Sequence, residues 1–105
     1  MSEYYFYLHL HPTNSRTCYG ITDNYERRLR EYEGHTGDVV DFTLLIGANK
    51  STIKELEKTL KNWILRLNVQ WKSYEWIDSS VDYKSVVETV LYLLADKEYK
   101  ILKDG

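Results

Sequence analysis

The alternation of apolar and polar residues divides the chain into short strands and helices that follow one another closely. Aromatic and apolar residues fill 4–10, and a second extended segment follows at 16–21, after a turn that contains Pro12. This pair predicts an antiparallel hairpin. A third apolar run, at 39–46, ends where Gly47 begins a break. The pattern therefore predicts three central strands.

Two helices are predicted to begin at capping-box pairs, in which an N-terminal side chain and a glutamate three residues later satisfy the first backbone amides. Asp23 with Glu26 opens a helix of about ten residues, a typical length, that ends at Gly34. Thr52 with Glu55 opens a longer helix. Its apolar side chains recur at helical spacing and predict one face lying on the sheet: Ile53, Leu56, Leu60, Trp63, Ile64 and Leu67.

The last third of the chain is less regular. Residues 69–77 resemble a short fourth strand or an extended segment, and Ser79 or Ser80 opens a final helix. The closing run 98–102 (EYKIL) is a candidate for an edge strand.

The order of these elements predicts an α/β fold. We expect a small sandwich with a central, mainly antiparallel sheet of three strands flanked by helices, plus a C-terminal helix. A length of 105 residues fits one domain, 1–105, with a core at about 4–77 and a helical extension at 78–105.

Composition narrows the class of protein. Hydrophobic residues make up 43% and charged residues 29%, as in globular proteins. A single cysteine excludes an internal disulfide, and with three histidines at no finger-like spacing it argues against structural zinc. We expect no leader and no membrane span, and hence a cytoplasmic protein.

The net charge of −2 hides a local excess of positive charge. Residues 50–72 contain six basic and two acidic side chains. Lys54, Lys58 and Lys61 on the long helix either solvate its outer face or contact a polyanion, and the sequence leaves both interpretations open.

Several short motifs in the first half resemble those of the GIY-YIG nuclease superfamily. Tyr5-Phe6-Tyr7 stands where the first motif belongs, and Cys18-Tyr19-Gly20 stands where the second belongs. The run after Gly20 is similar to the family's G-x-T-x-x-x-x-x-R-L pattern and places Arg28 on the first helix. Tyr32 falls one helical turn later, where the family has His or Tyr.

The second half carries two further matches. Leu56-Glu57-Lys58 resembles the Leu-Glu segment of the phage and prokaryotic stand-alone subgroup, and 74–77 (YEWI) is similar to its downstream Glu-Trp-aromatic signature. The resemblance covers about 4–77 and implies a metal-dependent endonuclease that hydrolyses phosphodiester bonds in DNA.

The resemblance also assigns roles to single residues. Tyr7 would position or deprotonate the attacking water, Arg28 would hold a phosphate oxygen beside Tyr32, and Glu57 would bind Mg²⁺ or Mn²⁺, with Glu75 in reserve. A fork-shaped guanidinium suits a phosphate, and a carboxylate suits a hard cation. Accessory phosphate contacts are expected from His9, His11, Lys54 and Lys61.

The chain departs from the family pattern at two positions. Cys18 replaces the tyrosine that opens the second motif, and Tyr19, one residue out of phase, is predicted to point to the opposite face of its strand. Ile21 replaces a basic residue. These changes motivate an alternative, a catalytically reduced domain that binds nucleic acid or a protein without cutting. A third possibility is an unrelated small interaction protein.

Related enzymes often attach a separate recognition domain, and we expect none here. Specificity would then come from nucleic-acid shape, self-association or a protein partner.

Overall fold

The computed structural model describes residues 3–10, 17–36, 43–67, 76–77 and 81–104. Within them it contains five strands and three helices. In chain order these are β1 (Tyr4–Leu10), β2 (Thr17–Thr22), α1 (Tyr25–Thr36), β3 (Leu44–Ala48), α2 (Lys50–Leu67), β4 (Trp76–Ile77), α3 (Tyr83–Leu93) and β5 (Lys100–Asp104).

The strands form one antiparallel sheet in the order β4-β2-β1-β3-β5. The predicted α/β class and the β1–β2 hairpin are confirmed. The predicted number of strands is wrong, because β4 and β5 extend the three central strands at either edge. Strand β5 follows α3, so the chain does not end in a helix, and it matches the candidate edge strand at 98–102 with its bounds shifted.

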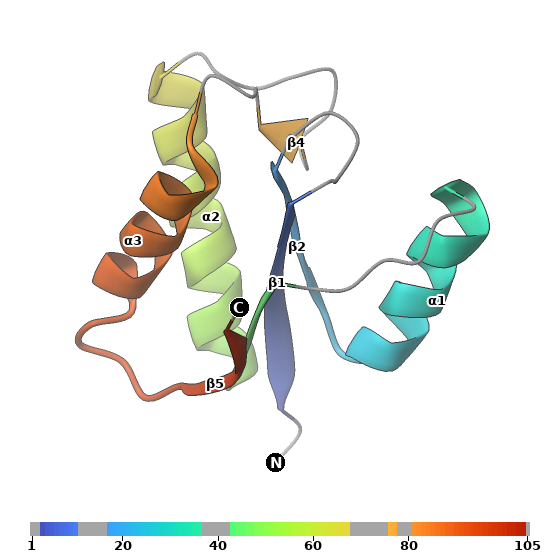
Figure 1. The fold of residues 1–105 in the computed structure, drawn as a ribbon. Coiled ribbons are helices and arrows are strands. Elements are labelled where there is room, and N and C mark those ends of the chain that lie inside the picture. The colour runs from blue at the N-terminus through green and yellow to red at the C-terminus, as the bar shows by residue number, and fades with distance from the viewer. Residues whose placement is uncertain (1–2, 11–16, 37–42, 68–75, 78–80, 105) are drawn as a thin grey trace.

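Helix α1 lies on one side of the sheet and helices α2 and α3 lie on the other (Figure 1), and alternate residues of β1 pack toward these two layers. Phe6 and Leu8 lie in the main core, which α2 and α3 cover. Tyr7, on the other face, packs with Leu45 beneath Leu29 of α1 and beside Tyr5. The molecule therefore has three layers, with α1 alone on one side of the sheet.

The helices begin at asparagines rather than at the predicted capping boxes. Asn24 Oδ1 accepts a hydrogen bond from the Arg27 amide at 3.1 Å, and Asn49 Oδ1 accepts one from the Thr52 amide at 2.9 Å. Asp23, predicted as the cap of α1, instead binds the Arg27 guanidinium. Asparagine satisfies the first free amides as well as aspartate does, so each helix begins one to three residues from the predicted cap.

The bounds of β3 and α3 also differ from the predicted ones. Strand β3 continues through Gly47 and Ala48, where a break was predicted. Helix α3 begins after Asp82, not at Ser79 or Ser80, and those serines lie outside the described residues. In the β3–β5 pair the register shifts between Leu45 and Ile46, which leaves Leu102 without an opposite residue.

Candidate functional site around Tyr7 and Arg28

Tyr7 and Arg28, predicted from separate motifs, meet in the structure. Tyr7 lies in the central strand and is 0% exposed. The Arg28 Nε atom donates a hydrogen bond to the Tyr7 hydroxyl at 3.0 Å. This contact joins α1 to the sheet and places a positive charge directly beside the phenolic oxygen.

Gly20 makes room for the tyrosine ring. It is the cross-strand partner of Tyr7, and a Cβ atom at this position would overlap the Tyr7 hydroxyl and ring. Because Tyr7 is fully buried, its ring could not move aside without disturbing its neighbours. The glycine of the second motif therefore has a structural reason here, namely the close approach of Tyr7.

Apolar side chains of α1 and β1 surround the cluster of Tyr7 and Leu45. Leu29 and Tyr25 pack against the Tyr7 cluster, and Tyr25 meets Tyr5 edge to face at 5.1 Å between ring centroids. Burial raises the pKa of Tyr5, and the nearby Glu3 and other acidic groups add to the increase. Ionisation of the Tyr5 hydroxyl, beside this cluster, is therefore disfavoured.

Arg28 also binds a carboxylate on its own helix. Its NH1 atom lies 3.1 Å from Oε2 of Glu31, while Oε1 of Glu31 lies 3.6 Å from Nε of Arg27. The Arg28 side chain is 32% exposed, so part of its guanidinium reaches solvent. Glu31 is three residues from Arg28, the spacing of a helical ion pair, so this contact follows directly from the sequence.

His9 and Cys18 form the next cross-strand pair on the same face as Tyr7 and Gly20. His9 is 6% exposed and Cys18 is 0% exposed. The side chains of His9, predicted to contact phosphate, and of Cys18 are therefore both buried. Tyr19 points to the opposite face, as predicted, and stacks on Phe6 in the main core.

Part of the predicted set cannot be placed in the site. Tyr32 belongs to α1, one turn after Arg28, but its side chain lies outside the described residues. His11 and Glu75 also lie outside them.

Glu57 is on α2, which packs against the opposite face of the sheet from α1 (Figure 1). It is half-buried at the margin of the apolar stripe, as expected. In the described part of the chain it forms no hydrogen bond or ion pair with Tyr7 or Arg28. Lys54 and Lys61 are on the same helix, so the structure separates the predicted set into two groups.

A metal shared between Glu57 and the Tyr7–Arg28 pair does not fit this arrangement. Across residues 3–10, 17–36, 43–67, 76–77 and 81–104, no three His, Cys, Asp or Glu side chains form a group that could hold a metal ion.

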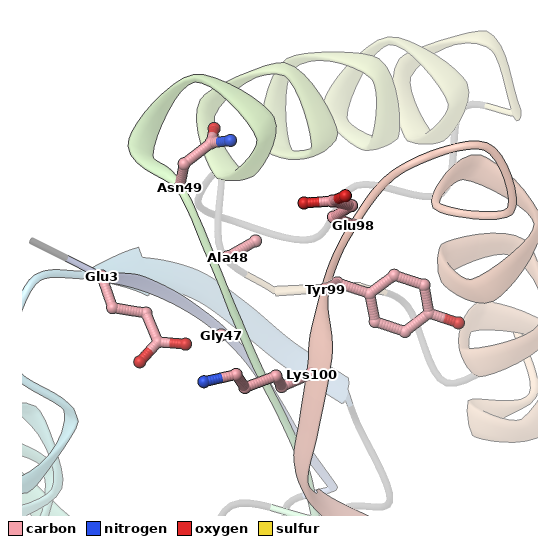
Figure 2. Close-up of a pocket in the computed structure, with 7 residues that line it drawn as sticks. All are labelled: Glu3, Gly47, Ala48, Asn49, Glu98, Tyr99 and Lys100. Atoms are coloured by element: carbon pink, nitrogen blue, oxygen red, sulfur yellow. The ribbon is translucent and has the colours of Figure 1, made fainter. Parts of the chain in front are cut away.

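A cleft of about 390 Å³ lies elsewhere, where β3 meets the start of α2. In Figure 2, Glu3 and Lys100 point toward one another across Gly47, and the Tyr99 ring points away from the opening. The carboxylates of Glu3 and Glu98 line the cleft, so it is poorly suited to a phosphate. It shares no residue with the Tyr7–Arg28 pair.

No helix among the described residues is both long enough and apolar enough to cross a membrane. In comparisons with known proteins, no family model, no curated protein and no solved structure matches this chain. The contact between Tyr7 and Arg28 therefore remains the main structural basis for a functional proposal.

Proposed function

We propose that this chain is a cytoplasmic DNA endonuclease of the GIY-YIG type, which binds a phosphodiester at Arg28 and promotes its hydrolysis. The observation that supports it most is the 3.0 Å contact between Arg28 Nε and the Tyr7 hydroxyl. Two residues from motifs 21 positions apart meet at the position where a third, Gly20, makes the space.

The exposed side of Arg28 is the part that would contact the phosphate. Its Nε is held by Tyr7, which fixes the plane of the guanidinium before DNA arrives. The terminal nitrogens can then donate two parallel hydrogen bonds to phosphate oxygens. Because Tyr7 is fully buried, we assign it the positioning of Arg28 in place of direct contact with water.

Mg²⁺ or Mn²⁺ remains part of this proposal only as a requirement of the resemblance. When bound, such an ion would neutralise phosphate charge and activate water. Glu57 does not share a site with Arg28 in this structure, so no step of the reaction is assigned to the ion.

The test compares Arg28 with a neighbouring arginine. Arg28→Ala should leave the fold intact and slow the nicking of supercoiled plasmid by orders of magnitude. Arg28→Lys should not restore the rate, because an ammonium lacks the planar fork. Arg30→Ala, an exposed position on the same helix, is the matched control and should cut normally. Equal activity of the Arg28→Ala and Arg30→Ala proteins would disprove the assignment.

A second candidate function is DNA or protein binding without cleavage. It is favoured by the complete burial of Tyr7 and by Cys18 at the position where the family has a tyrosine. Specificity would then depend on a protein partner or on self-association.

Metal-dependent cutting separates the two candidates. Glu57→Gln should abolish Mg²⁺- or Mn²⁺-dependent nicking if Glu57 holds the ion, whereas Glu55→Gln, on the exposed side of α2, should not. If the wild-type protein binds DNA but never cuts with any divalent metal, the non-catalytic function is correct. Normal cutting by Glu57→Gln would remove Glu57 from the mechanism.

A further inference from the structure

Four lysines form a line along one flank of α2. Lys50, Lys54, Lys58 and Lys61 are separated by four, four and three residues, and we call them the lysine stripe. At about 100° per residue they fall within an arc of about 80°. Three are exposed, and Lys61 is half-buried.

Little negative charge accompanies the stripe. Among the residues that the structure describes, Lys54 and Lys58 form no ion pair. The Lys50 ammonium lies 5.9 Å from the centroid of the Tyr4 ring, a contact that leaves its charge uncompensated. Glu57 lies at the margin of the lysine stripe. Glu55 lies on the other flank of α2, where its Oε2 atom is 3.8 Å from Nζ of Lys97.

The rest of α2 is already covered. Its apolar stripe is buried in the core, and its flank opposite the lysines faces α3 across a groove lined by Thr59, Trp63 and Arg66. On the lysine flank, Lys54 and Lys58 are directed to solvent and form no ion pair with any residue that the structure describes.

We propose that the lysine stripe binds the phosphate backbone of a DNA strand, as a surface separate from the Tyr7–Arg28 pair. The eleven helical steps from Lys50 to Lys61 span about 16 Å at 1.5 Å per residue, and so match about five nucleotides of one strand. This inference rests on the proposed function, since it names a second surface for DNA, on the opposite face of the sheet from Arg28. The contact is electrostatic and independent of base sequence.

A membrane surface is less well matched to the same lysines. Helices that lie in a membrane interface insert apolar side chains beside their basic ones. In α2 those side chains, Ile53, Leu56, Leu60 and Ile64, are buried against the sheet. The stripe therefore offers charge without apolar anchors, which suits a nucleic-acid backbone.

The experiment compares two triple variants. One removes three positive charges from the lysine stripe, and the other removes three positive charges from other parts of the surface. The test variant is Lys50→Gln/Lys54→Gln/Lys58→Gln, and the control is Lys84→Gln/Lys97→Gln/Lys100→Gln, all six being exposed. Binding of a fluorescein-labelled DNA oligonucleotide is measured by anisotropy over a series of salt concentrations. Thermal unfolding of both variants verifies that they fold.

The test variant should lose at least about tenfold in affinity, and its slope of log K against log salt should fall by about 2–3, close to one per lost phosphate contact. The control should change affinity by less than about twofold. Equal losses in both variants would overturn the proposal, because only net charge would then matter. Binding to phosphatidylserine vesicles in place of DNA would also overturn it.

The same measurements keep this inference distinct from the proposed function. If the wild-type protein never cuts DNA but the test variant alone loses affinity, the stripe is confirmed while the nuclease assignment fails. If the test variant binds DNA as tightly as the wild type while the wild type cuts, the stripe is wrong and the nuclease assignment stands.

Discussion

Helices α1 and α2 both carry positive charge, but they use it in different ways. On α1, Arg27 and Arg28 are bound to Asp23 and Glu31, and Arg28 also contacts a buried tyrosine. On α2, Lys54 and Lys58 are exposed and form no ion pair with any described residue. The first helix fixes the direction of one guanidinium, whereas the second presents a line of charge.

Under the proposed function, the two helices would bind DNA in two different ways. A guanidinium held in a fixed plane gives geometric specificity at a single phosphate. Exposed lysines give attraction over a longer range, which falls steeply as salt is added. We therefore expect substitutions on the α1 side to change the rate of cleavage, and those on the stripe to change affinity.

The largest effect on the α1 side is expected from Gly20→Ala. The added Cβ would overlap the buried Tyr7 ring and move it away from Arg28. We expect a loss of about 1–3 kcal/mol in the free energy of unfolding, measured by urea denaturation. Cleavage should fall with it, while affinity for DNA through the lysine stripe persists.

Gly34→Ala is the control for this substitution. Gly34 lies in α1, and a Cβ there would meet nothing within 4 Å. Alanine should leave stability unchanged or raise it by up to about 1 kcal/mol. If both alanine variants unfold at the same urea concentration, the close approach of Tyr7 to Gly20 has no energetic importance.

A smaller effect is expected from Glu31→Gln. It removes the carboxylate that occupies Arg28, so a phosphate would no longer have to displace it. Since exposed ion pairs contribute up to about 1 kcal/mol, DNA affinity should rise by about three- to fivefold at low salt. Glu26→Gln, an exposed charge on the same helix, should raise affinity less. Equal increases would show that Glu31 does not compete for Arg28.

The smallest effect concerns alkaline pH. Burial raises the pKa of Tyr83, and Asp104 adds to the increase, while a hydrogen bond with Thr43 opposes it. The folded protein thus holds this proton more tightly than the unfolded chain. The resulting stability is present below pH of about 10 and is lost as the pH rises through the folded-state pKa.

Replacing Tyr83 with Phe should therefore reduce the decrease in the free energy of unfolding at alkaline pH. Denaturation at several pH values measures this decrease. Tyr5→Phe should do the same in the α1 layer, since the pKa of Tyr5 is raised by burial too. If both variants lose stability at alkaline pH as the wild type does, the pKa values of Tyr83 and Tyr5 are not raised by folding.

Much of the fold follows from local pattern. The apolar stripe of α2 follows the helical period of 3.6 residues. The hairpin and the opposite orientation of Tyr19 follow the strand period of 2 residues, and both periods are visible in the sequence. The caps were misassigned because Asn24 and Asn49 lie one to three residues from equally good capping pairs. The number of strands was wrong because β4 and β5 pair with strands distant in the chain.

The candidate site was only partly predictable. The resemblance names both Tyr7 and Arg28, but their contact is visible only in the structure. The layer to which α2 belongs depends on tertiary packing, so the sequence does not show that Glu57 lies on the other face of the sheet. The burial of His9 and Cys18 was missed for the same reason. Motif spacing shows which residue types occur at which intervals. Which of these residues come into contact depends on how the helices pack on the sheet.

The Tyr7–Arg28 contact has a consequence for the order of folding. Both residues lie within the first 28 positions, in a hairpin followed directly by its helix. Strand β5, in contrast, pairs Asp104 with Leu44, more than half the chain away. Closing a short loop costs less entropy than closing a long one. We therefore expect the tyrosine and the arginine to meet early, before the C-terminal strand completes the sheet.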